Sequence, residues 1–232
     1  MILSTYQPFF APFPPFFTKA HLSSVTVLLD DVQFPQRTTW LTRNRFKNDQ
    51  GVLWLSIPVW RKGLGLQTIK DVKICSEGNW SRKHLESLKA SYANAPYFSE
   101  HLEFLREVFS GTFKNLIDLN MSIIEYLKKH LMIETPIVLQ SHLGIKAKGN
   151  GLLIEICRKM GARDYMAQAS AKKYLNQKLF SSAGISLHFY NPRPPIYPQL
   201  WGDFLFNLSA FDLLFNCGPK SHEVLGLGAS LR

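Results

Sequence analysis

The sequence predicts an α/β fold, with a mostly parallel sheet flanked by helices and a helical segment in the middle of the chain. Two patterns carry this prediction. Beyond residue 135, short apolar runs alternate with helical segments in the order typical of parallel βαβ units. The N-terminus shows the same order, with two apolar runs separated by an aromatic, proline-broken segment. With 232 residues, 46% of them hydrophobic and 19% charged, the chain is long and apolar enough for a packed core. We therefore expect residues 1–232 to form a single α/β domain.

The N-terminal unit places polar residues where two predicted strands end. A first strand begins at Met1–Leu3, an aromatic segment forms a short helix, and Val25–Leu29 forms the second strand. Ligands of open α/β sheets bind at the carboxyl ends of the strands. A βαβ unit with an ordinary polar rim is the alternative interpretation. The residues that we expect to converge on one crevice are Tyr6, Gln7, Lys19, Asp30, Asp31 and Gln33.

The segment before residue 76 is predicted to be rich in strands. Leu53–Val59 is a β-type run, and its Pro58 indicates an edge strand or the end of a strand. Ile69–Ile74 alternates apolar and polar residues, which predicts another strand.

Residues 80–131 change to helical spacing. The first predicted helix has Asn79 or Ser81 as its candidate cap. Two more helices are predicted over Ser99–Phe109 and Asn115–Leu131, the second with an apolar stripe along one side. We expect this segment to be a helical insertion between two α/β halves or a cap over the crevice.

The rest of the chain alternates strands and helices. Gly161 and Gly184 stand just after two of these helices, where glycine commonly ends a helix. The predicted strands are Pro136–Gln140, Asp164–Ala167 and Ile185–Tyr190, and the predicted helices are Gly151–Met160, Tyr174–Ser182 and Ser209–Asn216.

The last predicted helix carries a polar pair among apolar side chains. Asp212 and Asn216 are four residues apart and therefore lie on one face of the helix. If they are buried, they need hydrogen-bond partners, either in a ligand or in a backbone carbonyl. Ser209 is the expected N-cap of this helix.

The charge balance indicates an anionic partner. Lysine and arginine number 27 against 17 acids, a net charge of +10, which suits nucleic acid, acidic lipid or a phosphorylated metabolite. The basic residues are dispersed and no nucleic-acid-binding motif is present, which favours a phosphorylated small molecule over nucleic acid. Arg43, Asn44 and Arg45 offer planar donors for a phosphate or carboxylate, and a solvated basic loop is the alternative.

Cysteine usage and hydropathy favour a cytoplasmic protein. The three cysteines are an odd number and widely spaced, so they predict neither a disulfide framework nor a zinc site. No apolar run is long enough to span a bilayer, so we predict no transmembrane segment. The histidines show no paired metal-ligand spacing, and we predict no metal-ligating residues.

Several sequence motifs run through essentially the whole chain. They are Tyr6-Gln7-Pro8, Leu29–Phe34, Arg43-Asn44-Arg45, Trp54–Val59, Ala95–Phe98, Gly161–Tyr165, Tyr197–Gly202 and Asn207–Gly218. Together these motifs resemble the WbqC-like protein family.

This resemblance implies a role in the biosynthesis of surface-polysaccharide (O-antigen) precursors. The implied activity is that of a transferase or ligase, which attaches an aminoacyl or acyl group to an amino sugar of a nucleotide-activated sugar. Such an amide requires an activated carboxylate, and ATP with Mg²⁺ is a candidate cofactor for that activation. A non-catalytic scaffold or carbohydrate-binding partner of the same pathway is an alternative, and a nucleic-acid-binding protein is a second one.

The motifs and the strand ends together define the candidate site residues. The candidate catalytic groups are acids, since a carboxylate accepts a proton from an attacking amine or binds a metal that carries phosphates. They are Asp30, Asp31 and Asp212. The candidate substrate-binding residues are Tyr6, Gln7, Lys19, Gln33, Arg43, Asn44, Arg45, Tyr197, Gln199, Ser209 and Asn216.

The chain departs from the family pattern in two places. Family members usually carry a histidine where this chain has Tyr6. They also carry a glycine-rich turn where this chain has Gln168–Lys173. A phenol is a poor base near neutral pH, so the first change alters this copy if the family histidine transfers protons. The second removes glycines that would let a backbone approach a phosphate.

Overall fold

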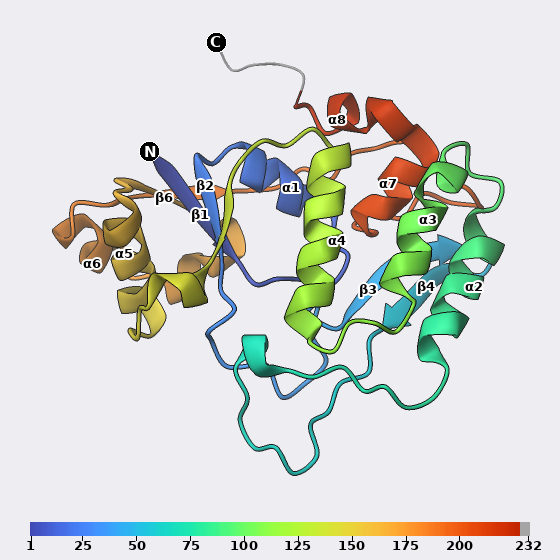
Figure 1. Cartoon of the computed structure of the whole chain (residues 1–232). Coiled ribbons are helices and arrows are strands. Elements are labelled where there is room, and N and C mark those ends of the chain that lie inside the picture. The colour runs from blue at the N-terminus through green and yellow to red at the C-terminus, as the bar shows by residue number, and fades with distance from the viewer. Residues whose placement is uncertain (228–232) are drawn as a thin grey trace.

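A computed structural model describes residues 1–227 and contains a parallel sheet, drawn in the left half of Figure 1. In the described residues the sheet has five strands in the order β5-β2-β1-β6-β7, and all neighbouring pairs run parallel. The predicted α/β fold is therefore confirmed. The strands are β1 (Ile2–Tyr6), β2 (Val25–Leu28), β5 (Ile137–Leu139), β6 (Asp164–Gln168) and β7 (Ser186–Tyr190).

The strand order places a topological switch point between β1 and β6. The chain adds β2 and β5 on one side of β1 and then crosses over to add β6 and β7 on the other side. Connections that leave neighbouring strands in opposite directions open a crevice at the carboxyl ends of those strands. Tyr6 is the last residue of β1 and Gln168 the last residue of β6, so both stand at this edge.

Helices cover both faces of the sheet. Helices α5 and α6 pack on one face, where Ile156 and Phe180 join Leu3 and Val27 of the strands in one buried cluster. The other face, with Leu28, belongs to a second cluster that includes side chains of α1, α2, α3, α4 and α7. Figure 1 shows α5 and α6 to the left of the sheet and α1 and α4 to its right. The helices are α1 (Pro14–His21), α2 (Trp80–Tyr92), α3 (Phe98–Val108), α4 (Leu116–His130), α5 (Gly149–Met160), α6 (Gln177–Ser182), α7 (Ala210–Cys217) and α8 (Ser221–Val224).

The helical middle segment agrees closely with its prediction. Helices α2, α3 and α4 lie where three helices were expected, and Asn79 occupies the N-cap position of α2 without a side-chain hydrogen bond. Gly161 ends α5 with a φ of 70°, as expected for a left-handed cap. The helix predicted from Tyr174 begins later, at Gln177, because Ala169–Tyr174 forms a 3-10 helix instead.

A separate antiparallel hairpin carries the motif around Arg43. Strands β3 (Arg43–Asn48) and β4 (Gly51–Ser56) form this two-stranded sheet, which lies beside α2 in Figure 1. The predicted strand Leu53–Val59 is thus present but stops before Pro58.

The predicted strand over Ile69–Ile74 is wrong. Its first residues, Ile69–Asp71, form a 3-10 helix, in which the N–H of Asp71 donates to the Thr68 carbonyl at 3.1 Å. Ile69 and Val72 are both fully buried. Their spacing of three residues places both side chains on one side of a 3-10 helix, whereas residues three apart in a strand point to opposite faces.

Two buried asparagines fix the loop that follows β1. The Nδ2 of Asn44 in β3 donates to the carbonyl oxygens of Phe10 and Ala11, at 3.1 and 2.7 Å. The Nδ2 of Asn120 in α4 donates to the Pro8 carbonyl at 2.7 Å. These side chains satisfy carbonyl groups that no regular strand or helix pairs. Hairpin and helix thereby set the course of the chain from β1 to α1.

Replacing Asn44 with alanine should therefore destabilise the protein. Asn44→Ala leaves two buried carbonyl groups unpaired, and we expect the free energy of unfolding to fall by about 1–3 kcal/mol in urea titrations. Asn48→Ala in the same strand removes only an exposed hydrogen bond to the Gln50 N–H, so its expected change is within about 0.5 kcal/mol. Equal effects of the two substitutions would contradict the assigned role of Asn44.

Candidate functional site

A cavity of about 520 Å³ opens beside the carboxyl ends of β2 and β5. Asp31 and Gln33 follow β2, and Gln140 follows β5. All three line the cavity, together with the start of α5. A cleft of this size at the carboxyl edge of a parallel sheet is a candidate binding place, although it lies beside β2 and β5 and not at the switch point between β1 and β6.

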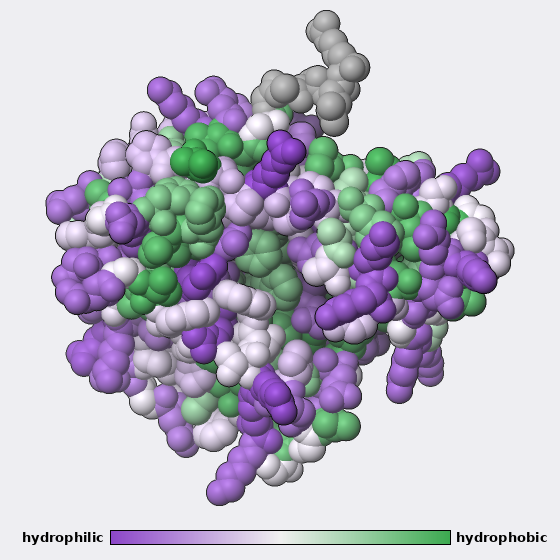
Figure 2. Space-filling view, turned by 180° about the vertical axis from the view of Figure 1, so that it is seen from behind, coloured by the Kyte–Doolittle hydropathy of each residue, from purple (hydrophilic) through white to green (hydrophobic). Residues whose placement is uncertain are grey.

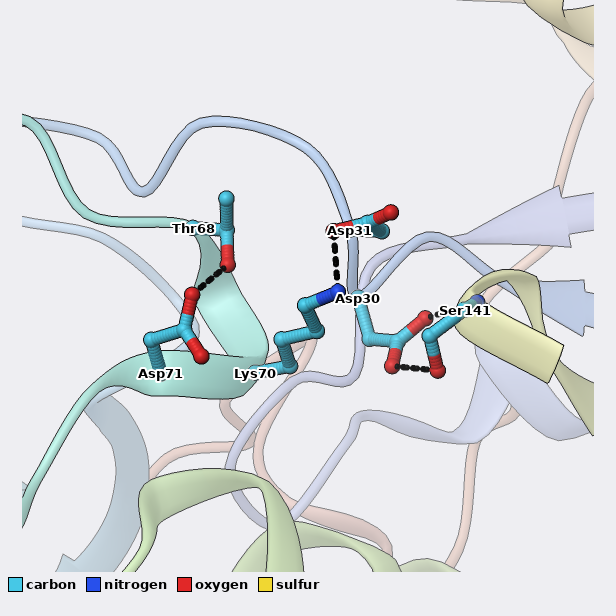
Figure 3. Close-up of polar contacts among 6 residues, drawn as sticks. All are labelled: Asp30, Asp31, Thr68, Lys70, Asp71 and Ser141. Atoms are coloured by element: carbon cyan, nitrogen blue, oxygen red, sulfur yellow. Dashed lines mark hydrogen bonds and ion pairs between the residues drawn. The ribbon is translucent and has the colours of Figure 1, made fainter. Parts of the chain in front are cut away.

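The two neighbouring acids at the end of β2 have different surroundings (Figure 3). The Asp30 carboxylate is 1% exposed and accepts hydrogen bonds from the Ser141 N–H at 2.9 Å and the Ser141 hydroxyl at 2.6 Å. Asp30 thus joins the end of β2 to the segment after β5. Asp31 forms an ion pair with Lys70 Nζ at 2.6 Å and has a side chain 32% exposed. Of the two acids, Asp31 is the one that lines the cavity.

The ion pair also affects Lys70. The hydrogen bond that Lys70 donates to the Asp31 carboxylate raises the pKa of the Lys70 ammonium group. The carboxylate that faces the cavity is therefore accompanied by a firmly protonated cation. Gln33 is exposed and forms an isolated antiparallel β-bridge with Thr68.

Tyr6 lies at the switch point between β1 and β6. Its hydroxyl accepts a hydrogen bond from Gln168 Nε2 at 3.0 Å, and its ring stacks on Phe16 with the centroids 4.5 Å apart. Burial raises the pKa of the Tyr6 phenol well above its usual value. The phenol is therefore neutral at physiological pH and acts as a hydrogen-bonding group rather than a base. The adjacent Gln7 is half-buried.

Lys19 is a buried lysine next to Tyr6. Its Nζ donates to the Thr5 carbonyl at 2.9 Å and lies 4.0 Å from the centroid of the Tyr6 ring. Burial lowers the pKa of the Lys19 amine to about 7. Both the charged and the neutral forms of this amine are therefore populated near neutral pH.

The hairpin residues form a second group, away from the sheet edge. The Arg43 guanidinium lies 3.5 Å from the centroid of the Trp54 ring. The ring centroids of Trp40 and Trp54 are 5.7 Å apart. A cavity of about 270 Å³ is lined by these side chains. Arg45 differs, because its Nη2 donates to the carbonyl oxygens of Phe206 and Asn207 at 3.1 and 2.9 Å. Trp40 is not among the site residues predicted from the sequence.

Asp212 sits inside the helical part of the molecule. Its Oδ2 accepts from the Tyr92 hydroxyl at 2.6 Å, and that hydroxyl in turn accepts from the Lys47 N–H at 2.8 Å. Burial raises the pKa of the Asp212 carboxyl, and the Tyr92 hydroxyl partly offsets this effect. Asn216 Nδ2 donates to the Asp212 backbone carbonyl at 2.7 Å. Of the two expected partners, a ligand or a backbone carbonyl, Asn216 thus has the backbone carbonyl. Ser209 caps the helix, as predicted, with its hydroxyl accepting from the Phe211 N–H.

The C-terminal motif residues join the hairpin. Gln199 Oε1 accepts from Lys47 Nζ at 3.3 Å and from the Leu205 N–H at 3.0 Å. Tyr197 is buried, and Asp212 contributes to the raised pKa of its phenol. Among residues 1–227, no hydrogen bond or ion pair links Asp30 or Asp31 to Asp212. The predicted residues therefore fall into two groups, one at the sheet edge and one around the hairpin and α7.

The start of α5 is the part of the cavity that sequence analysis missed. Lys146, Lys148 and Gly149 line the same cavity as Asp31, and so does Gln140, which follows β5. A signal for them was present in the sequence, since Gly144–Gly151 combines glycines and lysines between a strand and a helix. Such a loop is a common phosphate-binding arrangement.

Polar side chains cover much of the face of the molecule that is seen from behind (Figure 2). The surface is hollowed near the middle of that face, and apolar side chains form the floor of the hollow. In the described part of the chain, no helix is long and apolar enough to cross a membrane. Residues 1–227 also contain no cluster of three His, Cys, Asp or Glu side chains suited to a metal ion. Burial raises the pKa of Cys157 to about 12 and of Cys217 to about 11, so both thiols are protonated at neutral pH.

Fold and site together define a parallel α/β protein with a candidate binding cavity at the carboxyl edge of its sheet. The chain belongs to the WbqC-like protein family, whose model matches residues 7–224. It is 28% identical over 201 residues to the uncharacterised protein Rv1507c of Mycobacterium tuberculosis (strain ATCC 25618 / H37Rv), and the match covers 86% of each chain. No solved structure shows a significant match to this chain.

The buried amine of Lys19 should make stability depend on pH. Its pKa is about 7 in the folded protein, against 10.5 ordinarily, so the unfolded chain binds more protons between these values. The free energy of unfolding should therefore rise with pH in this window, by at most about 1.4 kcal/mol per pH unit. Lys19→Met should lose this rise in urea titrations at pH 7, 8 and 9, whereas Lys178→Met, at an exposed position, should keep it. Parallel pH dependences of wild type and Lys19→Met would show that Lys19 is not the group responsible.

The hydroxyl of Tyr6 should matter for stability rather than for proton transfer. Tyr6→Phe leaves the Gln168 amide without its partner, which should lower the free energy of unfolding by about 1 kcal/mol. Tyr6→His should not raise turnover of the substrates proposed below, because the residue at this position acts by hydrogen bonding. A faster Tyr6→His variant would instead assign proton transfer to position 6.

Proposed function

We propose that this protein is a transferase or ligase of surface-polysaccharide precursor biosynthesis. In this proposal it attaches an aminoacyl or acyl group to an amino sugar carried by a nucleotide. The observation that carries the proposal is the cavity at the carboxyl edge of the sheet, which is lined by a partly exposed carboxylate, Asp31, together with two lysines and a helix start. Family membership is consistent with this pathway.

Asp31 is the residue that we assign to the reacting amine. In the reaction the amine nitrogen attacks the acyl carbon, a C–N bond forms, and the bond between that carbon and its leaving group breaks. The proton released by the nitrogen passes to the Asp31 carboxylate, which has an open side toward the cavity. Asp30 acts as a positioning residue, because both of its carboxylate oxygens are held by Ser141.

The proposal predicts that Asp31 is needed for turnover. We expect Asp31→Asn to lower the rate of acyl transfer by about 10²-fold or more, the usual effect of removing a general base. The measurement is the mass gain of nucleotide-linked amino sugars, supplied with either acyl-coenzyme A or an amino acid plus ATP and Mg²⁺. Asp71→Asn is the matched control, since Asp71 bonds to Thr68 on the far side of Lys70 and does not line the cavity.

Two results would count against this assignment. Full activity of Asp31→Asn would remove Asp31 from the mechanism. A wild-type protein that gives no product with either donor would contradict catalysis of this reaction.

A second candidate function is carbohydrate binding without catalysis. The tryptophans at the hairpin favour it, because Trp40 is 39% exposed and Trp54 is 41% exposed, and flat aromatic surfaces of this kind suit the apolar faces of sugars. In this case sugars without a nucleotide should bind, and Trp40→Ala should abolish that binding while no acyl transfer is observed with any donor.

A further inference from the structure

The first turn of α5 forms one wall of the cavity beside Asp31. This helix has 12 residues, begins at Gly149, and has Lys148 as an N-cap that makes no side-chain hydrogen bond. The first N–H groups of a helix have no partner within the helix, and the helix dipole makes this end positive. Lys146 and Lys148 line the cavity at the same place. The wall therefore offers backbone donors and two cations to an anion.

Gln140 is a second, independent feature of the same cavity. Gln140 lines the cavity although it is only 2% exposed, and its Oε1 has no hydrogen-bond partner among the residues the structure describes. Buried polar atoms nearly always have a partner. Because Oε1 is an acceptor, a hydroxyl or N–H group of a ligand, and not a phosphate oxygen, would supply the missing donor. Gln140 thus indicates an occupant with polar groups rather than an apolar one.

The geometry of the α5 start is held from outside the cavity. The Oδ1 of Asn150 accepts from the Asn176 N–H at 2.9 Å, and its Nδ2 donates to the Tyr174 carbonyl at 3.2 Å. Gly149 has a φ of 56°, a backbone conformation that residues other than glycine rarely adopt. These restraints keep the first turn in place before a ligand arrives, so less ordering is needed on binding.

The charges around the cavity favour an anion at α5. The acid that lines the same cavity, Asp31, is already paired with Lys70 at 2.6 Å. Lys146 and Lys148 are exposed, and no carboxylate of residues 1–227 forms an ion pair with them. Two unpaired cations at a helix start are a typical phosphate-binding arrangement.

We propose that this cavity binds the phosphate groups of a phosphorylated ligand at the first turn of α5, with Lys146 and Lys148 as counter-ions and Gln140 bonded to the same ligand. The phosphate site is argued from the geometry of the cavity. The identity of the ligand, a nucleotide-linked sugar, rests on the proposed function. Asp31 lines the same cavity, so a diphosphate bound at α5 and a sugar amine at the Asp31 carboxylate would belong to one bound ligand.

Calorimetric titration of the full chain with inorganic pyrophosphate and with UDP tests this site. The double variant Lys146→Gln/Lys148→Gln should weaken both ligands by at least tenfold, and Gln140→Leu should weaken UDP several-fold. The double variant Lys172→Gln/Lys173→Gln removes the same charge from residues that do not line the cavity, and its affinity should remain within twofold of wild type. Thermal unfolding checks that each variant is folded, and Lys146 and Lys148 are exposed, so folding should be unaffected.

The outcomes separate the site from the proposed function. Equal losses in the two double variants would mean that only the net charge matters, and unchanged affinity in Lys146→Gln/Lys148→Gln would overturn the site. Site-dependent pyrophosphate binding without acyl transfer would keep the site and reject the function. Acyl transfer with an unchanged KM for the nucleotide-linked sugar in Lys146→Gln/Lys148→Gln would keep the function and reject the site. Uridine, which has no phosphate, should bind equally to wild type and to the two double lysine variants.

Discussion

The parallel pairing of β1 with strands on both sides is the constraint on which the rest of the structure depends. β1 pairs with β2 along one edge and with β6 along the other. Each parallel pair requires a long connection across a face of the sheet. Those connections supply α1, the hairpin, the helical segment and α5, and they bring the chain back to the same edge each time. The acids, Gln140 and the start of α5 are neighbours for this reason.

Much of this arrangement could be predicted because it depends on local patterns. The parallel strands, the glycine after α5 and the Ser209 cap all follow from residues close together in the chain. The hairpin strand β3 was missed because all of its residues except Phe46 are polar, so the segment resembles a solvated loop. The surroundings of Asp212 were also beyond sequence reasoning, since Tyr92 is 120 residues away. The cavity acids were predictable as strand ends, but only the fold separates Asp30, bonded to Ser141, from Asp31.

The use of basic residues inside the fold changes what the net charge means. Lys19, Lys47 and Arg45 each donate to backbone carbonyl oxygens, and Arg61 does so as well. Lys47, Arg45 and Arg61 bond to carbonyl groups of irregular backbone, whereas Lys19 bonds to Thr5 in β1. The charge of +10 is therefore partly structural. A local concentration of free cations, as at Lys146 and Lys148, says more about a ligand than the total does.

The position of Lys19 has a consequence for chemical labelling. Lys19 is only 2% exposed, so acylating reagents reach it when α1 moves away from β1. Burial is what lowers its pKa to about 7, so in the opened state the amine is mostly protonated and reacts as an ordinary surface lysine does. Lysines at the surface are accessible but almost entirely protonated. The rate at which Lys19 is modified therefore records how often the N-terminal unit opens, without any probe added to the protein.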